Sequence, residues 1–376
     1  MFEMPSEDDI KAGRTTDVYF IRTERVLEEK GVNPSVVAEV TSSSTNLNVF
    51  AGLHDALKLL EGLPIDVYAM REGTIFYPRE PVLYIVGRYL SFARYENPLL
   101  GFLCHASGIA SRAASIKLAA GDKPVISFGT RRVHPALAHV VERSAWIGGM
   151  DGVSNVSAAQ ALGIPASGTM PHSLIICFGD QVAAWRAFDE VLEEDVPRVC
   201  LCDTYWDEKL ESIMAAQTLG DRLSAVRLDT TSSRRGNIRR IVEEVRYELD
   251  IRGFSHVGIF VSGSMDEHSV AELADIVDGF GVGTSVSAAP PIDFALDIVE
   301  KEGVPCAKRG KWGGRKQVWR NWDTLEGRIT PFGAHVDGME PVLEKVMEDG
   351  RILIQSNHHD AREHLLSQLE VLRGRE

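Results

Sequence analysis

Several polar residues follow short apolar runs in the middle of the chain, where their side chains could bind a phosphorylated substrate. Two turns stand out, Ser262-Gly263-Ser264 and Gly281-Val282-Gly283-Thr284. Small residues let the backbone amides approach an anion closely, and a following helix adds a favourable dipole. A single turn of this kind would be explained well enough as a tight turn. Two in succession favour a phosphate ligand.

Charged residues near these turns add further candidates. Asp203 and Asp229 end separate apolar runs, and carboxylates beside a phosphate typically hold a divalent cation or ribose hydroxyls. Capping a helix is their alternative role. Arg131 and Arg132 could clamp a pyrophosphate, although adjacent arginines are more often solvated. His172 could be a nucleophile or phosphate ligand, and a structural histidine is an equally good interpretation.

Other chemistries lack the residues that they need. No Lys follows a candidate strand in this region, which disfavours a Schiff-base aldolase, and no Ser-His-Asp spacing is apparent. His358, His359 and His364 lie in a polar stretch that predicts a solvated helix face rather than a metal site. The five cysteines are an odd number without metal-type spacing, which is typical of reduced thiols in a cytosolic protein. We therefore predict no metal-ligating residues among these side chains.

A parallel sheet must position the candidate residues, because short apolar strands alternate with amphipathic helices from about Lys123 onward. Ile238, Ile241, Val242, Val245 and Leu249 recur at helical spacing, which predicts a crossover helix. Ser264 and Glu267 predict a capping box for a helix that ends at Gly279. The six predicted strands are Val125 to Phe128, Ala166 to Met170, Val199 to Asp203, Ala225 to Asp229, Val257 to Ser262 and Phe280 to Thr284.

Six strands are fewer than the eight of a complete barrel, so the predicted architecture is an incomplete (β/α) barrel, with a doubly wound sheet as second choice. Before it, a helix over Asn48 to Leu60 and strands over Ile65 to Met70, Thr74 to Tyr77 and Pro81 to Val86 indicate an α+β domain. The predicted domains are residues 1–120 (α+β), 121–305 (barrel) and 306–376. The last segment is expected to pack on the N-terminal domain or the barrel.

The composition narrows the class of protein. The 376 residues carry a formal charge of −14, which gives no general attraction for nucleic acid or anionic lipid. The longest apolar runs are far shorter than the roughly 20 residues of a membrane span. The segment Met1 to Lys11 is acidic and does not resemble a secretory signal. We expect a cytoplasmic protein with no membrane or nucleic-acid partner.

The chain resembles the nicotinate phosphoribosyltransferase family, especially its short archaeal and bacterial members, from about Thr15 to Arg320. The resemblance rests on several short sequence strings in a fixed order, and no single string is enough. The strings are Thr16-Asp17-Val18-Tyr19, Phe128-Gly129-Thr130-Arg131-Arg132, Asp151-Gly152-Val153-Ser154-Asn155-Val156, Gly168-Thr169-Met170-Pro171-His172-Ser173, Asp203-Thr204-Tyr205, Arg227-Leu228-Asp229, the two turns and Gly314-Arg315-Lys316-Gln317-Val318.

The resemblance implies a type II phosphoribosyltransferase. Nicotinate and phosphoribosyl pyrophosphate would give nicotinate mononucleotide and pyrophosphate, with Mg²⁺, in NAD salvage. The site would form in a homodimer, which could assemble further, with Tyr19 of the neighbouring subunit stacked on the pyridine ring opposite Phe128. The remaining contacts implied are Arg227 to the acceptor carboxylate, Arg131 to the pyrophosphate, Asp229 to the ribose hydroxyls, the two turns to the 5-phosphate, and Arg132 and Thr169 to the substrates.

Two positions bear on the details of the reaction. Related enzymes that use nicotinamide carry an Asp where this chain has Ser154; an Asp accepts a hydrogen bond from an amide but repels a carboxylate, so Ser154 favours nicotinate. Family members often couple ATP hydrolysis through a phosphorylated histidine, which His172 matches. Pro171 departs from the small residue that many relatives have before it, so ATP dependence stays open. Since no Cys follows Cys306, the C-terminal zinc module of some relatives is not expected.

Three other functions remain as alternatives. Quinolinate phosphoribosyltransferase performs the same transfer with decarboxylation, in a more basic pocket. A non-catalytic dimer that senses phosphates or nucleotides could retain the barrel. An aldolase or isomerase would form a borohydride-trappable intermediate, which the missing Lys argues against.

Overall fold

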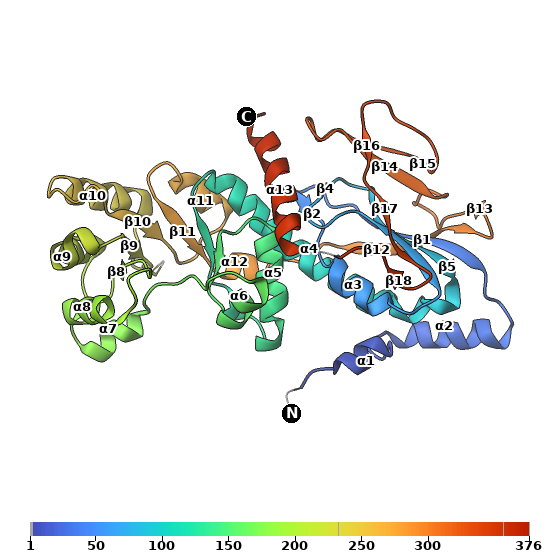
Figure 1. Cartoon of the computed structure of the whole chain (residues 1–376), viewed down its shortest axis with the longest axis horizontal. Helices are drawn as coiled ribbons and strands as arrows, with labels where there is room; N and C mark the ends of the chain where they lie inside the picture. Colours follow the sequence, from blue (N-terminus) through green and yellow to red (C-terminus); the bar gives the residue numbers. More distant parts are fainter. Residues whose placement is uncertain (1–2, 232, 356, 376) are drawn as a thin grey trace. The chain divides into compact units, whose positions relative to one another are not determined.

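The structure is a computed structural model that describes residues 3–231, 233–355 and 357–375. The chain divides into two compact units (Figure 1). The first contains Met1–Ala114, Ile147–Gly149 and Pro290–Glu376, and the second contains Ser115–Trp146 and Met150–Ala289. The predicted fold class, an incomplete barrel with an α+β domain to which the C-terminal segment returns, is confirmed.

The first unit is built on a seven-stranded sheet, in the order β13-β12-β1-β5-β3-β17-β18, with smaller sheets β15-β14-β16 and β2-β4. Its helices are α1 (Glu7–Lys11), α2 (Val18–Glu29), α3 (Leu53–Leu60), the first part of α4 (Glu96–Ala120) and α13 (His358–Arg373). Its strands are β1 (Ser35–Ser42), β2 (Asn48–Val49), β3 (Ile65–Ala69), β4 (Ile75–Phe76), β5 (Pro81–Arg88), β12 (Phe294–Lys301), β13 (Val304–Pro305), β14 (Lys316–Arg320), β15 (Gly327–Pro331), β16 (Glu340–Pro341), β17 (Glu344–Glu348) and β18 (Arg351–Ile352).

In the large sheet, three strands from the N-terminal part of the chain are flanked on both sides by strands from the C-terminal part. β1 pairs antiparallel with β12 on one side and with β5 on the other, and β3 pairs with β17. This pairing explains why the observed units differ from the predicted boundaries at residues 120 and 305. The segment from Pro290 joins the first unit because its partner strand lies more than 200 residues earlier, and α4 contributes to both units.

The helix predicted over Asn48 to Leu60 begins only at Leu53. Asn48 and Val49 instead pair with Phe76 and Ile75 as a short strand. Gly52, with φ of 91°, ends that extended segment and precedes the helix, since a positive φ suits glycine. The first part of the predicted helix was therefore wrong.

α4 is long and apolar enough to cross a membrane by length and composition. Within Ala93–Ala120, however, 61% of the apolar window is buried inside the protein. Leu99 and Leu103 pack in the core of the first unit with residues of its large sheet. This burial is what a core helix requires.

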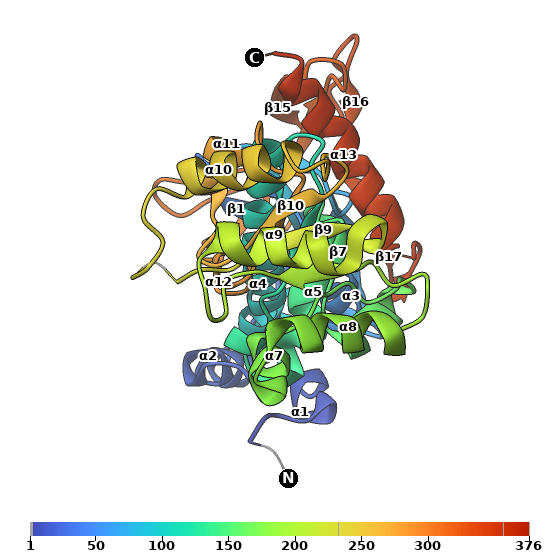
Figure 2. The same cartoon turned by 90° about the vertical axis from the view of Figure 1, so that its left-hand side faces the viewer.

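The second unit contains a six-stranded parallel sheet in the order β7-β6-β11-β10-β9-β8. Helices α8, α9 and α10 lie side by side (Figure 2). The elements are β6 (Val125–Ser127), α5 (Ala138–Ile147), β7 (Gly152–Val153), α6 (Val156–Leu162), α7 (His172–Phe178), α8 (Gln181–Val191), β8 (Val199–Leu201), α9 (Glu208–Leu219), β9 (Ala225–Leu228), α10 (Ile238–Asp250), β10 (Gly258–Val261), α11 (Glu267–Leu273), β11 (Gly279–Val282) and α12 (Thr284–Ser287).

Two predictions in this unit were wrong. Ala166 to Met170 is not a strand. The sixth strand is β7, and the Ser167 amide donates to the carbonyl of Val153 in that strand at 2.8 Å. The small residues there offer little apolar surface to hold a strand. The capping box also lies elsewhere: Asp266 and Ser269 cap α11, which ends at Leu273 rather than at Gly279.

Candidate active site

The carboxyl ends of the parallel strands bring together most of the predicted site residues. Parallel strands end at the same edge of a sheet, so the residues that follow them lie near one another. From one edge of the sheet to the other, these residues are Ser154 after β7, Phe128 after β6, Gly283 after β11, Ser262 after β10, Asp229 after β9 and Asp203 beyond β8.

Asp203 and Asp229 form the acidic centre of this edge. The buried Asp203 Oδ2 accepts hydrogen bonds from the Asp229 amide (2.6 Å) and from Thr230 Oγ1 (2.8 Å). Its Oδ1 is buried and lacks a hydrogen-bond partner among the described residues. Burial raises the pKa of Asp203. A carboxylate oxygen with no donor, next to a second carboxylate, is suited to a cation or a substrate hydroxyl.

His172 is the first residue of α7 and faces both carboxylates. Its Nε2 lies 3.6 Å from Asp203 Oδ1 and 3.8 Å from Asp229 Oδ2. Its Nδ1 is 3.0 Å from Thr204 Oγ1, which fixes the ring. His172 thus lies beside the two strand-end aspartates.

Arg227 points from β9 toward Phe128. Its guanidinium donates to Thr169 Oγ1 and, at 3.3 Å, to Asp229 Oδ2. The guanidinium carbon is 5.9 Å from the centre of the Phe128 ring, and only 12% of the side chain is exposed. Its Nε is buried without a hydrogen-bond partner among the described residues. A largely desolvated guanidinium beside an aromatic ring can bind a planar carboxylate.

Phe128 occupies space that a side chain at position 281 would fill. A Cβ on Gly281 would lie 2.3 Å from Phe128 Cε2. The Phe128 amide also donates to the carbonyl of Val282 (2.7 Å). Gly281 therefore sets the position of the aromatic ring, a role beyond the phosphate contact that the sequence suggested.

The turn after β10 contains two successive residues with positive φ. Gly263 has φ of 83° and Ser264 has φ of 56°. Ser262 Oγ donates to Asp229 Oδ1 at 2.8 Å, which joins this turn to the acidic centre. Thr284 begins the short helix α12 directly after Gly283. Successive amides in such a turn can surround an anion.

Sequence reasoning missed two residues that organise this edge. Glu211 on α9 is fully buried and accepts three hydrogen bonds, from the amides of Thr204, Tyr205 and Trp206. Arg235, in the loop after β9, donates to carbonyls of that loop and of the turn after β10. The available signal for Arg235 was the arginine pair five and six residues after the strand-end Asp229. For Glu211 we find no such signal.

Three predicted residues lie outside these contacts. Arg131 and Arg132 form an exposed turn after β6. Tyr19 is on α2 of the first unit and is 53% exposed. Their predicted roles with pyrophosphate and with the pyridine ring stay predictions.

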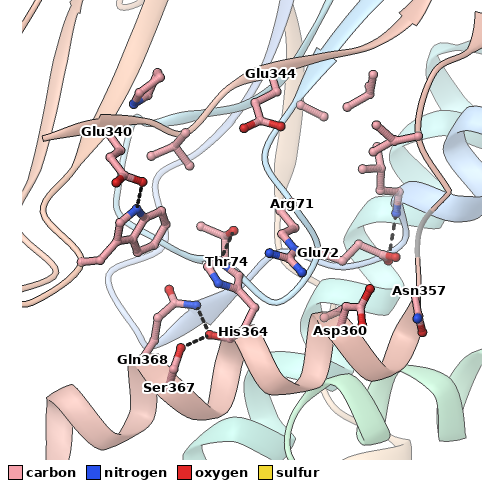
Figure 3. A pocket seen from close by; sticks show the side chains of 18 of the residues that line it. Arg71, Glu72, Thr74, Glu340, Glu344, Asn357, Asp360, His364, Ser367 and Gln368 are labelled. Carbon is pink, nitrogen blue, oxygen red and sulfur yellow. Dashed lines mark hydrogen bonds between the residues drawn. The ribbon is translucent and has the colours of Figure 1, made fainter.

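A separate cavity of about 620 Å³ lies in the first unit (Figure 3). It is lined by His364 and Gln368 of α13, and by Arg71, Thr74 and other residues of the first unit. His364 Nε2 is 3.1 Å from Thr74 Oγ1. The prediction of a solvated face for the His358, His359 and His364 cluster is therefore wrong for His364, whose partner lies 290 residues away in the sequence.

Burial, with a smaller effect of Arg71, lowers the pKa of His364 from 6.5 to about 4. The folded protein then binds fewer protons here than the unfolded chain does, so its stability falls as the pH drops below about 6.5 and toward 4. Between pH 7 and pH 5, we expect the wild type to lose about 2 kcal/mol more unfolding free energy than His364→Gln does. Urea unfolding at both pH values measures this, with the exposed His256→Gln as control. Equal losses in wild type and His364→Gln would contradict it.

Two family models match most of the chain, one for each domain of a known enzyme. The model of the N-terminal domain of quinolinate phosphoribosyl transferase matches residues 17–107, and that of its C-terminal domain matches residues 109–297. A nicotinate phosphoribosyltransferase of Mycobacterium tuberculosis is 34% identical over 309 residues, which cover 77% of this chain and 65% of the relative. The chain therefore spans about 65% of that relative's length.

Solved structures agree with these matches. A nicotinate-nucleotide pyrophosphorylase from Pyrococcus furiosus is 52% identical, with a TM-score of 0.96 and 98% of each chain covered. Human nicotinic acid phosphoribosyltransferase is 21% identical, with a TM-score of 0.73 and coverage of 95% of this chain and 94% of the human one. The human structure shows the shared fold alone.

Proposed function

Because this chain belongs to the quinolinate phosphoribosyltransferase family, we propose that it transfers a phosphoribosyl group from phosphoribosyl pyrophosphate to a pyridine carboxylate. The product is nicotinate mononucleotide. The observation that carries the proposal is the convergence of Phe128, Arg227 and Asp229 at one sheet edge, beside the glycine turn at Gly263. These groups supply a surface for a flat ring, a cation for its carboxylate, an acceptor for ribose hydroxyls and amides for a phosphate.

The reaction suits this set of residues. The pyridine nitrogen attacks the anomeric carbon, the bond from that carbon to pyrophosphate breaks, and positive charge develops on the ribose ring. The nitrogen is unprotonated, so no general base is needed. The Asp229 carboxylate holds the ribose and stabilises the developing charge, while Arg227 orients the acceptor.

Nicotinate is the first candidate acceptor. Among the described residues, the cationic side chains that contact Asp229 or the turn after β10 are Arg227, Arg235 and, when protonated, His172. Arg235 donates its N–H groups to three carbonyls. The guanidinium that lies over Phe128 is that of Arg227. One guanidinium beside two carboxylates suits an acceptor with one carboxylate. The name of the Mycobacterium tuberculosis relative also supports nicotinate.

Quinolinate is the second candidate. The family models carry its name, and they match both domains. Together with the 52% identical Pyrococcus furiosus structure, they support quinolinate better than the 34% identical relative supports nicotinate. The charges of the site and the names of the relatives thus favour different acceptors, which one assay separates.

The assay supplies phosphoribosyl pyrophosphate and Mg²⁺ with nicotinate, nicotinamide or quinolinate, each with and without ATP. We expect nicotinate mononucleotide from nicotinate, detected by chromatography, without release of carbon dioxide. Product from quinolinate alone, with one carbon dioxide for each mononucleotide, would establish the second candidate. Tight binding of nicotinate without any product would indicate a sensor instead of an enzyme.

Mg²⁺ fits the acidic centre as a cofactor shared with the substrate. The described residues contain no group of three or more His, Cys, Asp or Glu side chains able to hold a metal. Mg²⁺, however, usually keeps waters and binds one or two carboxylates together with substrate phosphates. Asp203 and Asp229 would hold it, and Asp203 Oδ1 accepts no hydrogen bond in the described part of the chain. When bound, the ion would neutralise charge on the leaving pyrophosphate.

His172 is the proposed site of any coupling to ATP. Its Nε2 faces Asp203 and Asp229, and its Nδ1 contacts Thr204. The reactions with and without ATP test this coupling. A rate of mononucleotide formation that ATP does not change would contradict it.

We further propose a cytoplasmic homodimer. α2 exposes an apolar stripe in which Val18 is 59%, Tyr19 53% and Val26 60% exposed. Stripes of this kind often mark a protein interface. Five free cysteines in the described chain suit a reducing compartment. Sedimentation analysis tests the dimer, and a fully active monomer would contradict it.

Ser154→Asp tests the choice between acid and amide. The Ser154 amide donates to the carbonyl of Ser127 (3.1 Å), which places this residue next to the strand that carries Phe128. A carboxylate at position 154 would repel nicotinate and accept a hydrogen bond from nicotinamide. We expect kcat/KM for nicotinate to fall about 10- to 100-fold, with Ser157→Asp as the exposed control. Unchanged selectivity would mean that Ser154 does not face the acceptor.

A further inference from the structure

Arg235 joins two of the loops at the carboxyl edge of the barrel sheet. It lies between β9 and α10, and its side chain is half-buried. Its Nε donates to the carbonyl of Thr230 at 3.1 Å. Its Nη2 donates to the carbonyls of Ser262 (2.9 Å) and Gly263 (2.7 Å). One guanidinium thus holds the loop after β9 to the turn after β10.

These bonds determine where the amides of the turn point. In a trans peptide, the N–H of one residue is directed opposite to the carbonyl of the residue before it. The carbonyls of Ser262 and Gly263 face Arg235, so the amides of Gly263 and Ser264 face away from it. Neither amide donates a hydrogen bond to a described residue. Two successive amides without acceptors are available to an anion.

The turn is closely packed between Arg235 and Asp229. A Cβ on Gly263 would lie 3.0 Å from Arg235 Nη2 and 3.1 Å from Asp229 Oδ1. Gly263 also has φ of 83°, which disfavours other residues. The carboxylates of Asp229, Asp203 and Glu208 raise the pKa of Arg235, against the larger effect of burial, which lowers it. The guanidinium therefore also offsets negative charge close to the amides.

We propose that Arg235 is a positioning residue for phosphate binding: it holds the carbonyls of Ser262 and Gly263 so that the amides of Gly263 and Ser264 face the 5-phosphate of the ribosyl substrate. This rests on the proposed function, because that function supplies the phosphorylated ligand. Arg235 acts through the turn and does not itself contact the phosphate.

Calorimetric binding of ribose 5-phosphate to the full chain tests the role without requiring catalysis. We expect Arg235→Ala to weaken binding about 10- to 100-fold, since hydrogen bonds to a charged group are lost. Arg235→Lys should recover little of the affinity, because an ammonium group lacks the planar fork that reaches three carbonyls. Arg234→Ala removes the exposed neighbouring arginine and should bind within twofold of the wild type. In turnover, KM for phosphoribosyl pyrophosphate should rise far more than kcat falls.

The outcomes separate this proposal from the proposed function. Full recovery of affinity in Arg235→Lys would indicate a direct charge contact and would overturn the positioning role, as would unchanged affinity in Arg235→Ala. If circular dichroism shows that Arg235→Ala is unfolded, the affinity of Arg235→Lys for ribose 5-phosphate is the test of the positioning role. A wild type that binds ribose 5-phosphate but converts no pyridine carboxylate would remove the proposed function and leave the role of Arg235 standing. Failure of the wild type to bind ribose 5-phosphate would overturn the proposed role of Arg235.

Discussion

Asp229→Asn is expected to lower kcat for mononucleotide formation by about 10²- to 10³-fold, the usual effect of removing one group that stabilises charge in a transition state. Asp229 Oδ1 accepts from Ser262 and Oδ2 from Arg227. Asn keeps the shape but removes the negative charge, and it places an NH₂ group where one acceptor stood. The ribose would therefore lose both a hydroxyl partner and a stabilising charge as pyrophosphate leaves.

The measurement is steady-state turnover at saturating concentrations of both substrates. Asp278→Asn is the matched control, because Asp278 accepts from the Ile259 amide (2.8 Å) at the opposite, amino-terminal side of the sheet. An Asn oxygen preserves that bond, so this variant should turn over within about twofold of the wild type. A rate for Asp229→Asn within tenfold of the wild type would remove Asp229 from the proposed chemistry.

The strand-end residues could be predicted from the sequence because their position follows from a local pattern. Asp229 ends an apolar run, and the carboxyl ends of parallel strands share one edge. The rule predicts that Asp203, Asp229 and Ser262 lie close together, as their hydrogen bonds show. It requires no knowledge of which strands are neighbours, since every strand of such a sheet presents its carboxyl end to the same side.

Features that depend on distant partners could not be predicted in this way. β12 belongs to the large sheet of the first unit because it pairs with β1, and nothing within Phe294–Lys301 identifies that partner. His364 is partly buried, and its Nε2 lies 3.1 Å from Oγ1 of the distant residue Thr74. In both cases the local composition resembles that of other segments, and long-range packing decides the structure.

The capping box of α11 was predicted at the wrong residues, although a capping box does precede this helix. Ser264 precedes Glu267 by three residues, as a capping box requires. Ser264, however, adopts φ of 56° in the turn after β10, whereas an N-cap residue has an extended conformation. Asp266 and Ser269 cap the helix in its place. The demand of the turn for its backbone conformation therefore overrode the local helix signal.

Arg227→Gln is expected to raise the dissociation constant of nicotinate by about 10²- to 10³-fold, because truncating one partner of a buried charge pair typically costs about 2–5 kcal/mol. The guanidinium is largely buried and lies beside Phe128, with Thr169 and Asp229 fixing its direction. Gln can still donate one hydrogen bond, but it carries no charge to oppose the carboxylate of the acceptor. Arg227→Lys should recover only part of the affinity, since an ammonium group cannot bind a carboxylate through two parallel N–H groups.

Calorimetry with nicotinate, and separately with ribose 5-phosphate, distinguishes this role from general damage to the site. Loss of nicotinate binding with ribose 5-phosphate affinity kept within a few-fold would place Arg227 at the acceptor. Arg186→Gln on α8, an exposed arginine of the same unit, serves as the control for loss of one positive charge. Equal weakening for nicotinate and nicotinamide would contradict the assignment, because the uncharged amide gains far less from the guanidinium than the carboxylate does. The comparison therefore tests the charge of the acceptor directly, which is the property that relates this arginine to the proposed reaction.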